Sequence, residues 1–423
     1  MRRVVHKMVP RCLLHSGAGG ARGGLGRGGR LGRMTSVPVI KIGEPRELLA
    51  LVPFQLGVEP RDSLVVVSVR ARDRCVGLVA RVDLEAFADD EDGVATADFL
   101  AVRMAQDEAA QVVVVVYTDR TRAEVADPAT LEGRAVWHLL AALWPGADGG
   151  VWVVGPTGYG SLRCQDASCC PPEGRPVTDL QATVVGAHMV AAGFGVVRDR
   201  AALRVQGEAG PDERRRTGRE AAAERRRRRT AGRELPGRRR PGGFHLPPGW
   251  GDAMLLVWFD QCARVRDGLP LAPEALGRLL AALEVPLVRD ALVLAVAEGR
   301  TAQHADCLAD ALGGLGGAAG DRPDQARADD ARGVLEAVVR HTSGRARATP
   351  LATLACLEWW SGNGARANVL VEQCLEADGA HRLGLTLLHA LAAGLAPGWV
   401  NAEPAPEDGP QDEPWDEAWG SWW

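Results

Sequence analysis

Three cysteines carry the clearest chemical signal in the sequence. Cys164, Cys169 and Cys170 form the pattern C-x4-C-C, with Asp166 between them. Thiolates bind soft metal ions such as Zn²⁺ well, but a structural zinc site uses four ligands. Only three thiols are local, and the C-x2-C spacing typical of zinc sites is absent. The pattern therefore leaves a zinc site, a redox site and a structural loop open.

Each interpretation of the cysteine loop has its own requirement. A zinc site needs a fourth ligand from elsewhere, such as Cys75, His188 or a carboxylate. A redox site needs a lowered thiol pKa, which the nearby Arg163 or Arg175 would provide. A structural loop needs only rigidity, and the adjacent Pro171–Pro172 holds the preceding residue extended. The structural interpretation is the simplest of the three.

A second group of polar residues flanks two predicted strands. Asp62 and Ser63 open an apolar, β-branched run, and Arg81 and Asp83 close the next one. Arg81 and Asp83 are two residues apart, so they lie on one face of the strand. Because α/β sheets place ligands at strand ends, these four residues are candidate ligand contacts. The alternative is a surface ion pair beside a strand-opening turn.

Known catalytic patterns are missing from the sequence. Gly155, Gly158 and Gly160 follow a predicted strand, but their spacing is not G-x-G-x-x-G and no helix follows at once. The sequence has no G-x-S-x-G or H-E-x-x-H motif, and no lysine after Lys41 to complete a P-loop. No catalytic residue is therefore assigned.

The elements that hold these residues predict an α/β domain over residues 38–197. Gln111–Tyr117 contains five consecutive valines, which is typical of a strand buried on both faces. Helical patterns at Thr96–Ala110 and Thr130–Leu143 alternate with the strands, and Val151–Val154 is a further buried strand. This alternation predicts a mixed or parallel sheet with helical cover. Gly155–Thr178, which is rich in Gly, Pro and Cys, is predicted as a loop.

The second half of the chain is predicted to be all-α over residues 250–398. Pro273–Leu283 begins with proline and places four leucines at helical spacing. A helix after Thr349, a turn at Gly362–Ala365 and a further helix resemble a tetratricopeptide-type helical hairpin. No repeat of about 34 residues recurs, so a full solenoid is not expected.

Charge is segregated along the chain, although the net charge is only −4. By count, residues 1–33 carry +8, residues 198–243 carry +9 and residues 401–423 carry −7. Blocks of like charge tend to be disordered. We therefore expect a disordered basic arm at 1–37, an Arg-rich linker at 198–249 and a disordered acidic tail at 399–423. A start of translation at Met34 would make residues 1–33 upstream sequence.

The charged segments suggest partners. Arg214–Arg240 has the guanidinium density to bind nucleic acid, but it lacks interleaved aromatic residues, so a solvated linker is favoured. The tail carries Trp415, Trp419, Trp422 and Trp423, which are candidate anchors for a protein partner. Its negative charge also complements the basic tract. A merely solubilising tail is the simpler alternative.

Composition excludes several classes of protein. The chain has 423 residues, of which 46% are hydrophobic and 25% charged, so a globular core is expected. No apolar stretch is long enough for a membrane span. Nine cysteines in irregular spacing favour reduced thiols, hence a cytoplasmic protein without a secretory signal.

Three stretches together resemble a known family. They are Glu47–Leu84, with the string DSLVVV, Leu162–Val177, with the string CCPPEG, and Pro350–Leu395. In this order they are similar to the bacterial domain-of-unknown-function family numbered 4192, over most of residues 38–398. The resemblance implies no activity, substrate or catalytic residue. Members commonly begin near the position of Met34.

Two classes of function remain at this point. The favoured one is a non-enzymatic cytoplasmic interaction or regulatory protein, with a protein partner bound by the helical domain or the Trp-rich tail. The alternative is an enzyme, or a sensor of a small ligand or metal, that uses the α/β strand ends and the Cys164–Cys170 loop. Zinc is the cofactor that the loop would suit.

Overall fold

The computed structural model describes residues 4–8, 44–71, 75–191, 194–233, 247–297, 323–395 and 397–400. The chain divides between Val196 and Val197 into two compact units, an α/β unit and a helical unit. The predictions for residues 1–3 and 9–37 of the arm, for 234–246 of the Arg-rich linker and for the Trp-rich tail at 401–423 lie outside the described residues.

The α/β unit is built on a seven-stranded sheet in the order β1-β3-β2-β4-β5-β6-β7. The strands are β1 (Val4–Met8), β2 (Ser63–Arg70), β3 (Val76–Asp83), β4 (Ala109–Tyr117), β5 (Asp148–Val154), β6 (Gly158–Ser161) and β7 (Arg175–Pro176). β4 and β5 pair in parallel, and all the remaining neighbouring pairs are antiparallel. The sheet is therefore mixed, and the predicted α/β class is confirmed.

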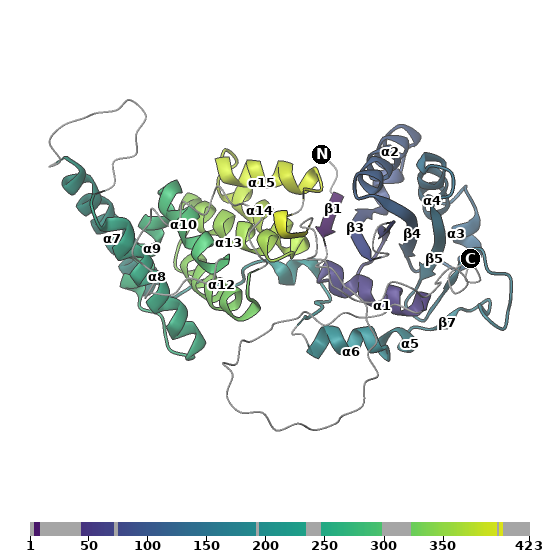
Figure 1. Ribbon diagram of the computed structural model, residues 1–423, viewed down its shortest axis with the longest axis horizontal. Helices are drawn as coiled ribbons and strands as arrows, with labels where there is room; N and C mark the ends of the chain where they lie inside the picture. Colours follow the sequence, from purple (N-terminus) through teal and green to yellow (C-terminus); the bar gives the residue numbers. More distant parts are fainter. Residues whose placement is uncertain are drawn as a thin grey trace, which may run out of the picture. The chain divides into compact units, whose positions relative to one another are not determined.

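Helices cover both faces of the sheet (Figure 1). They are α1 (Pro45–Leu56), α2 (Asp90–Gln106), α3 (Arg122–Ala126), α4 (Leu131–Ala142), α5 (Thr178–Gln181) and α6 (Val184–Ala191), with a short 3-10 helix, η1 (Leu84–Phe87). In Figure 1, α2 and α4 lie on one side of the sheet, and α1 and α6 lie on the other. Val112, Val114 and Val116 pack with Leu100 and Leu139 under α2 and α4. The intervening Val113 and Val115 are also fully buried, which explains the unbroken valine run of β4.

Two predictions about the α/β unit are wrong in part. Val4–Met8, predicted as part of a disordered arm, forms β1 and pairs antiparallel with β3. Gly155–Thr178, predicted as a loop, contains β6 and β7. The glycines at 158 and 160 make β6 difficult to predict from the sequence, because glycine is a weak strand former.

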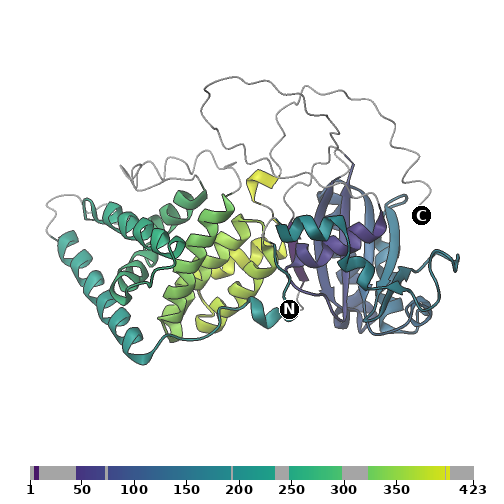
Figure 2. The same ribbon diagram turned by 90° about the horizontal axis from the view of Figure 1, so that it is seen from below.

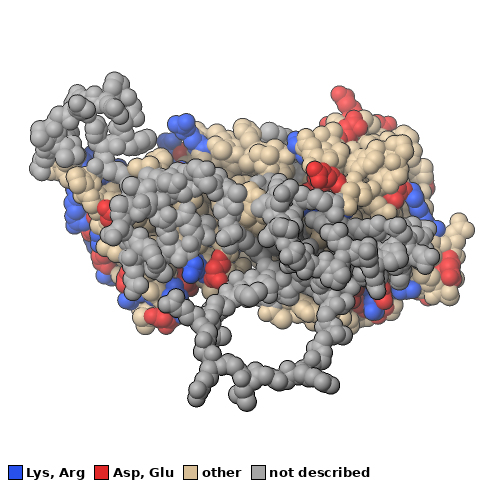
Figure 3. Space-filling model, in the orientation of Figure 1, with Lys and Arg blue, Asp and Glu red and all other residues tan. Residues whose placement is uncertain are grey.

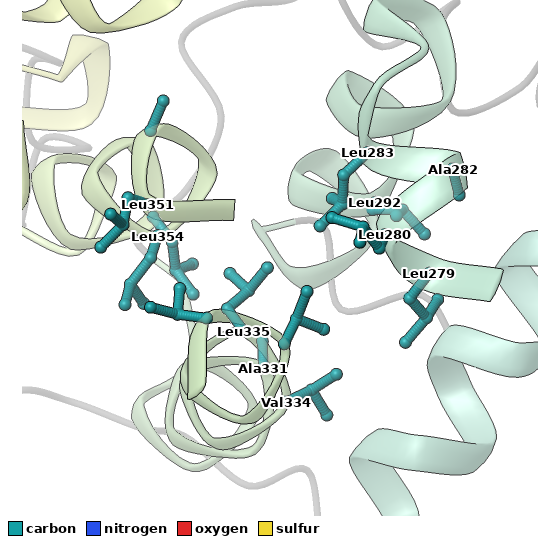
Figure 4. Packing of buried hydrophobic residues seen from close by; sticks show 14 of the residues in the cluster. Leu279, Leu280, Ala282, Leu283, Leu292, Ala331, Val334, Leu335, Leu351 and Leu354 are labelled. Carbon is teal, nitrogen blue, oxygen red and sulfur yellow. The ribbon is translucent and has the colours of Figure 1, made fainter. Parts of the chain in front are cut away.

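The helical unit has a continuous hydrophobic core. Its helices are α7 (Pro211–Arg233), α8 (Trp250–Arg266), α9 (Pro273–Leu283), α10 (Pro286–Ala297), α12 (Gln325–Arg340), α13 (Ala348–Trp360), α14 (Gly364–Ala377) and α15 (Arg382–Ala392), with short 3-10 helices η2 (Arg200–Leu203), η5 (Gly344–Arg347) and η6 (Gly398–Val400). Figure 4 shows Leu335 of α12 with Leu351 of α13 on one side and Leu279, Leu280 and Leu283 of α9 on the other. Figure 2 shows the same helices from below.

The Arg-rich segment is not a free linker over its described length. Residues 211–233 form the single helix α7, which packs against α9. Thr217 and Ala221 of α7 are fully buried, and a Cβ on Gly277 of α9 would lie 2.5 Å from the Thr217 carbonyl oxygen. The two helix backbones therefore touch at Gly277. The predicted linker is wrong for residues 198–233, which belong to the helical unit.

The described helices are too short or too polar to span a bilayer.

Candidate functional site

The three cysteines of the C-x4-C-C pattern lie together in the structure. The Sγ atoms of Cys164, Cys169 and Cys170 all lie within 4.8 Å of one another. Cys170 is buried, with 3% of its surface exposed, while Cys164 and Cys169 are partly exposed. The cluster therefore has one buried and two accessible thiols.

Main-chain hydrogen bonds fix the turn that presents these thiols. The N–H groups of Cys169 and Cys170 both donate to the carbonyl oxygen of Asp166, over 3.1 and 2.7 Å. The carboxylate of Asp166 accepts from the N–H and hydroxyl of Ser168, over 2.8 and 2.6 Å. This turn places two adjacent cysteines on the same side as Cys164.

Two arginines anchor the turn to the rest of the α/β unit. Arg175 of β7 donates through Nε to the carbonyl oxygen of Cys169 at 2.5 Å, and its other nitrogen lies 3.6 Å from the Cys169 Sγ. Arg122, the first residue of α3, donates to the carbonyl oxygens of Ser161 and Cys170, over 3.0 and 2.9 Å. Both arginines hold main-chain atoms, so the turn is fixed independently of the thiols.

The surroundings shift the pKa values of Cys164 and Cys170 in opposite directions. A hydrogen bond with the Asp166 backbone lowers the pKa of Cys164. Burial raises the pKa of Cys170. Cys164 is therefore the readier of these two to exist as the thiolate.

The predicted supporting residues of the loop do not all join it. Among the described residues, the only cluster of three or more His, Cys, Asp or Glu side chains with metal-ligand spacing is that of Cys164, Cys169 and Cys170. Cys75 immediately precedes β3, and His188 contacts the Val184 carbonyl within α6. Arg163 pairs with Asp148. Neither proposed fourth ligand is thus part of the cluster.

The polar residues at the strand ends lie close together. Arg81 and Asp83 form an ion pair of 2.6 Å, and Arg81 also donates to the Arg61 carbonyl oxygen at 3.2 Å. Asp62 has a φ of 42°, and its carbonyl oxygen accepts from the Leu84 N–H. Ser63 is fully buried. The Arg81–Asp83 contact and the Asp62 carbonyl contact fit the ion pair and the strand-opening turn, while the buried Ser63 hydroxyl has no hydrogen-bond partner.

The structure separates the strand-end group from the cysteine loop. One row of strand partners runs from Asp83 through Ser63, Tyr117, Val154 and Tyr159 to Arg175. Five inter-strand steps of about 4.8 Å make this roughly 24 Å along the sheet. The two candidate groups therefore lie at opposite ends of the row and form no common site.

Much of the positive charge of α7 is paired within the helical unit. Arg216 pairs with Glu274 at 2.8 Å, Arg225 pairs with Glu284, and Arg227 pairs with Glu220 at 2.7 Å. The Arg228 guanidinium lies over the Trp250 ring, 5.4 Å from its centroid. On the face shown in Figure 3, acidic and basic side chains are interspersed. These four arginines therefore have partners within the helical unit.

A further arrangement was not anticipated from the sequence: an extended segment, residues 204–209, lies against α14. The Val205 N–H donates to Oε1 of Gln373 at 3.0 Å, and Nε2 of Gln373 donates to the Val205 carbonyl oxygen at 3.2 Å. Val205 is 4% exposed and Gln373 is 8% exposed. One buried side-chain amide thus satisfies both backbone groups of one residue.

Ion pairs flank this amide contact on both sides. Arg200 forms two hydrogen bonds of 2.9 Å with the Glu372 carboxylate. Arg204 binds both oxygens of Glu376, one of them at 3.1 Å. The two arginines are four residues apart in sequence, and so are the two glutamates. This matched spacing of Arg200 and Arg204 with Glu372 and Glu376 is the sequence signal that could have revealed the contact.

Additional main-chain contacts extend along the segment. Arg366 donates to the Leu203 carbonyl oxygen at 3.4 Å, and Arg340 donates to that of Gln206 at 3.1 Å. The Ala209 N–H donates to the Arg340 carbonyl oxygen at 2.9 Å. The face formed by α14 and the end of α12 therefore binds residues 200–209 chiefly through their backbone and two arginines.

Comparison with family models matches residues 45–398 to the domain of unknown function DUF4192. The chain belongs to this family. The match spans both units, so the DUF4192 region includes the cysteine loop, the segment 200–209 and α14. No curated protein and no solved structure matches the chain.

Proposed function

We propose that this DUF4192 protein is a non-enzymatic interaction protein of the cytoplasm, whose helical unit binds extended peptide segments along α14. The observation that carries the proposal is the contact of Gln373 with both backbone groups of Val205. A side-chain amide has both a donor and an acceptor, so it recognises an extended backbone whatever side chain is attached. Main-chain hydrogen bonds of this kind supply affinity in other modes of peptide recognition.

The flanking charges define the partner. Glu372 and Glu376 select two basic residues spaced four apart, and the buried site of Val205 selects an apolar residue next to the second one. The expected partner therefore presents Arg-x3-Arg on a short helical turn such as η2, followed by an apolar residue in an extended segment. A bidentate arginine–carboxylate pair supplies geometric specificity as well as energy.

The chain's own residues 200–209 act as the resident ligand of this surface. Because the segment is covalently attached, its effective concentration at α14 is in the millimolar range. A partner must displace the segment, so the surface is autoinhibited at low partner concentration. This arrangement favours a regulatory role for the contact.

Other features support a non-catalytic cytoplasmic protein. Cys262, Cys356 and Cys374 are free thiols in the helical unit, and burial raises the pKa of each, which suits a reducing compartment. His381 accepts the Gly384 N–H in the first turn of α15, so its ring serves as a helix cap. His138 is buried in α4, with its Nε2 3.4 Å from the Asp90 carboxylate.

A peptide-binding experiment tests the proposal. A fluorescently labelled peptide of residues 197–210 is titrated into the full chain and into a full-chain Arg200→Ala/Arg204→Ala variant. Weakening the resident segment should raise the affinity for the added peptide by about tenfold or more. Adding Gln373→Ala to that variant should remove the gain. Equal affinity in all three proteins would overturn the proposal.

A further inference from the structure

We infer that Cys164, Cys169 and Cys170 form a binding site for one thiophilic divalent cation of the zinc class. The inference concerns the α/β unit and is independent of peptide binding by the helical unit. It starts from the clustering of three Sγ atoms within 4.8 Å of one another. Zn–S bonds of about 2.3 Å in a tetrahedral site place sulfur atoms about 3.8 Å apart. Side-chain movements of about 1 Å would therefore bring the thiols to metal-binding distance.

The turn makes adjacent cysteines compatible with one metal. Neighbouring cysteines seldom reach the same ion from an extended chain, because their side chains point to opposite sides. Here the N–H groups of Cys169 and Cys170 converge on one carbonyl oxygen, that of Asp166. This tight turn, rather than an extended strand, brings both thiols beside Cys164. In this loop the turn brings the thiols together, as the C-x2-C spacing does in other zinc sites.

The surroundings of the cluster suit an anionic metal centre. Three thiolates and one divalent cation carry a net charge of −1. The Arg175 guanidinium lies 3.6 Å from the Cys169 Sγ, and Arg122 binds the Cys170 carbonyl oxygen. Outer groups that hold ligands in place are a regular part of metal sites. Both guanidinium groups would offset the negative charge that the bound ion leaves.

The cluster supplies three ligands and leaves one position for an external donor. The Asp166 carboxylate, the nearest oxygen ligand in sequence, is already bound to Ser168. With three protein ligands, a zinc ion keeps a water or a small ligand as its fourth. Cys164 and Cys169 are partly exposed, so such a ligand would reach the ion from solvent. A small thiol is the class of external ligand that a soft, three-thiolate ion would favour.

A cobalt titration tests the site directly. The full chain is reduced, stripped with a chelator and titrated anaerobically with Co²⁺, which reports thiolate ligation by charge-transfer absorption. We expect saturation at one ion per chain and displacement by Zn²⁺. Cys164→Ser, Cys169→Ser and Cys170→Ser should each lower Co²⁺ affinity by about tenfold or more. Cys356→Ser, which removes a thiol from α13, serves as the matched control and should leave binding unchanged.

A second measurement keeps the inference testable if a loop variant fails to fold. The wild-type chain is alkylated with and without one equivalent of Zn²⁺, and each cysteine is quantified by mass spectrometry. Zinc should slow alkylation of Cys164 and Cys169 by about tenfold or more and leave Cys356 unaffected. Absent charge-transfer absorption, unaltered alkylation or a disulfide within the loop of the anaerobic protein would each overturn the inference.

Discussion

The side-chain amide of Gln373 on α14 hydrogen-bonds both backbone groups of Val205, over 3.0 and 3.2 Å. Because both residues are buried, Gln373→Ala would leave a donor and an acceptor of Val205 without partners. Leaving such groups buried costs about 1–3 kcal/mol each, so the segment should detach rather than remain in place. We expect faster tryptic cleavage after Arg204 in the full-chain variant.

The control for this prediction is Gln206→Ala. The Gln206 side chain donates to the Ala201 carbonyl oxygen and is exposed, so its loss leaves the α14 contact intact. Cleavage after Arg204 should then match that of the wild type. Equal cleavage in the Gln373→Ala and Gln206→Ala variants would show that the amide contact does not hold the segment.

The packing of α7 on α9 predicts opposite effects for two glycines. A Cβ on Gly277 would lie 2.5 Å from the Thr217 carbonyl oxygen, whereas a Cβ on Gly218 would have nothing within 4 Å. Gly277→Ala should force the helices apart and lower the free energy of unfolding by about 1–3 kcal/mol. Gly218→Ala should raise it by up to about 1 kcal/mol, because alanine favours the helix.

Urea unfolding of the full chain, followed by circular dichroism, measures both effects. Helicity is the appropriate signal because α7 is one of the longest helices of the unit. A stability loss confined to Gly277→Ala would support the packed helix. Equal tolerance of both substitutions would instead show that α7 is a solvated segment, as the sequence alone suggests.

A buried carboxylate joins three helices of the helical unit. Glu358 of α13 is fully buried and accepts from Arg332 of α12 at 2.5 Å, from Arg366 of α14 at 2.8 Å and from Asn363 at 3.1 Å. Glu358→Ala would remove the buried carboxylate that neutralises the positive charges of Arg332 and Arg366. Removing one partner of a buried ion pair costs about 3–5 kcal/mol, and urea unfolding should show a loss of that size.

Asp329→Ala is the comparison for the buried carboxylate. Asp329 also pairs with Arg332, but its side chain is 52% exposed. Exposed ion pairs contribute about 1 kcal/mol or less, so this variant should remain close to the wild type in stability. If both variants lost equal stability, burial of the Glu358 network would not be its decisive property.

The cap of α15 makes the helical unit sensitive to mild acid. Nδ1 of His381 accepts from the Gly384 N–H at 3.2 Å, and burial lowers the pKa of His381 below 6.5. The unfolded chain therefore binds a proton before the folded chain does. This contribution is complete above the unfolded pKa, and it is lost as the pH falls from about 6.5 through the folded pKa.

His381→Asn isolates this contribution, because asparagine is a strong N-cap without a titrating group. Urea midpoints between pH 7.5 and 5 should fall less steeply for His381→Asn than for the wild type. Parallel pH profiles for the two proteins would exclude His381 as the responsible group.

The sequence was most informative where one periodicity dominates. Pro273–Leu283 was predicted as a helix with these bounds, because a proline at its first position and leucines at helical spacing agree. The unbroken valines of β4 likewise predicted burial on both faces, and those of Val112–Val116 are fully buried. In both elements, local propensity and burial indicate the same structure.

The sequence was least informative where small or charged residues make the contact. The buried stripe of α7 is formed by Thr217 and Ala221 among many arginines, so its amphipathic pattern is faint. The C-x4-C-C pattern is visible in the sequence, but the closeness of its thiols depends on a turn and on Arg122, which is distant in sequence. The contact of residues 200–209 with α14 joins segments far apart along the chain.

Hydrogen exchange across residues 199–210 of the full chain tests the central claim most directly. We predict that these amides, and most of all the Val205 amide, exchange slowly in the protein alone. An excess of the 197–210 peptide should speed their exchange, because the peptide displaces the resident segment from α14. Rapid exchange without peptide, or protection that excess peptide leaves unaltered, would contradict a displaceable ligand at this surface.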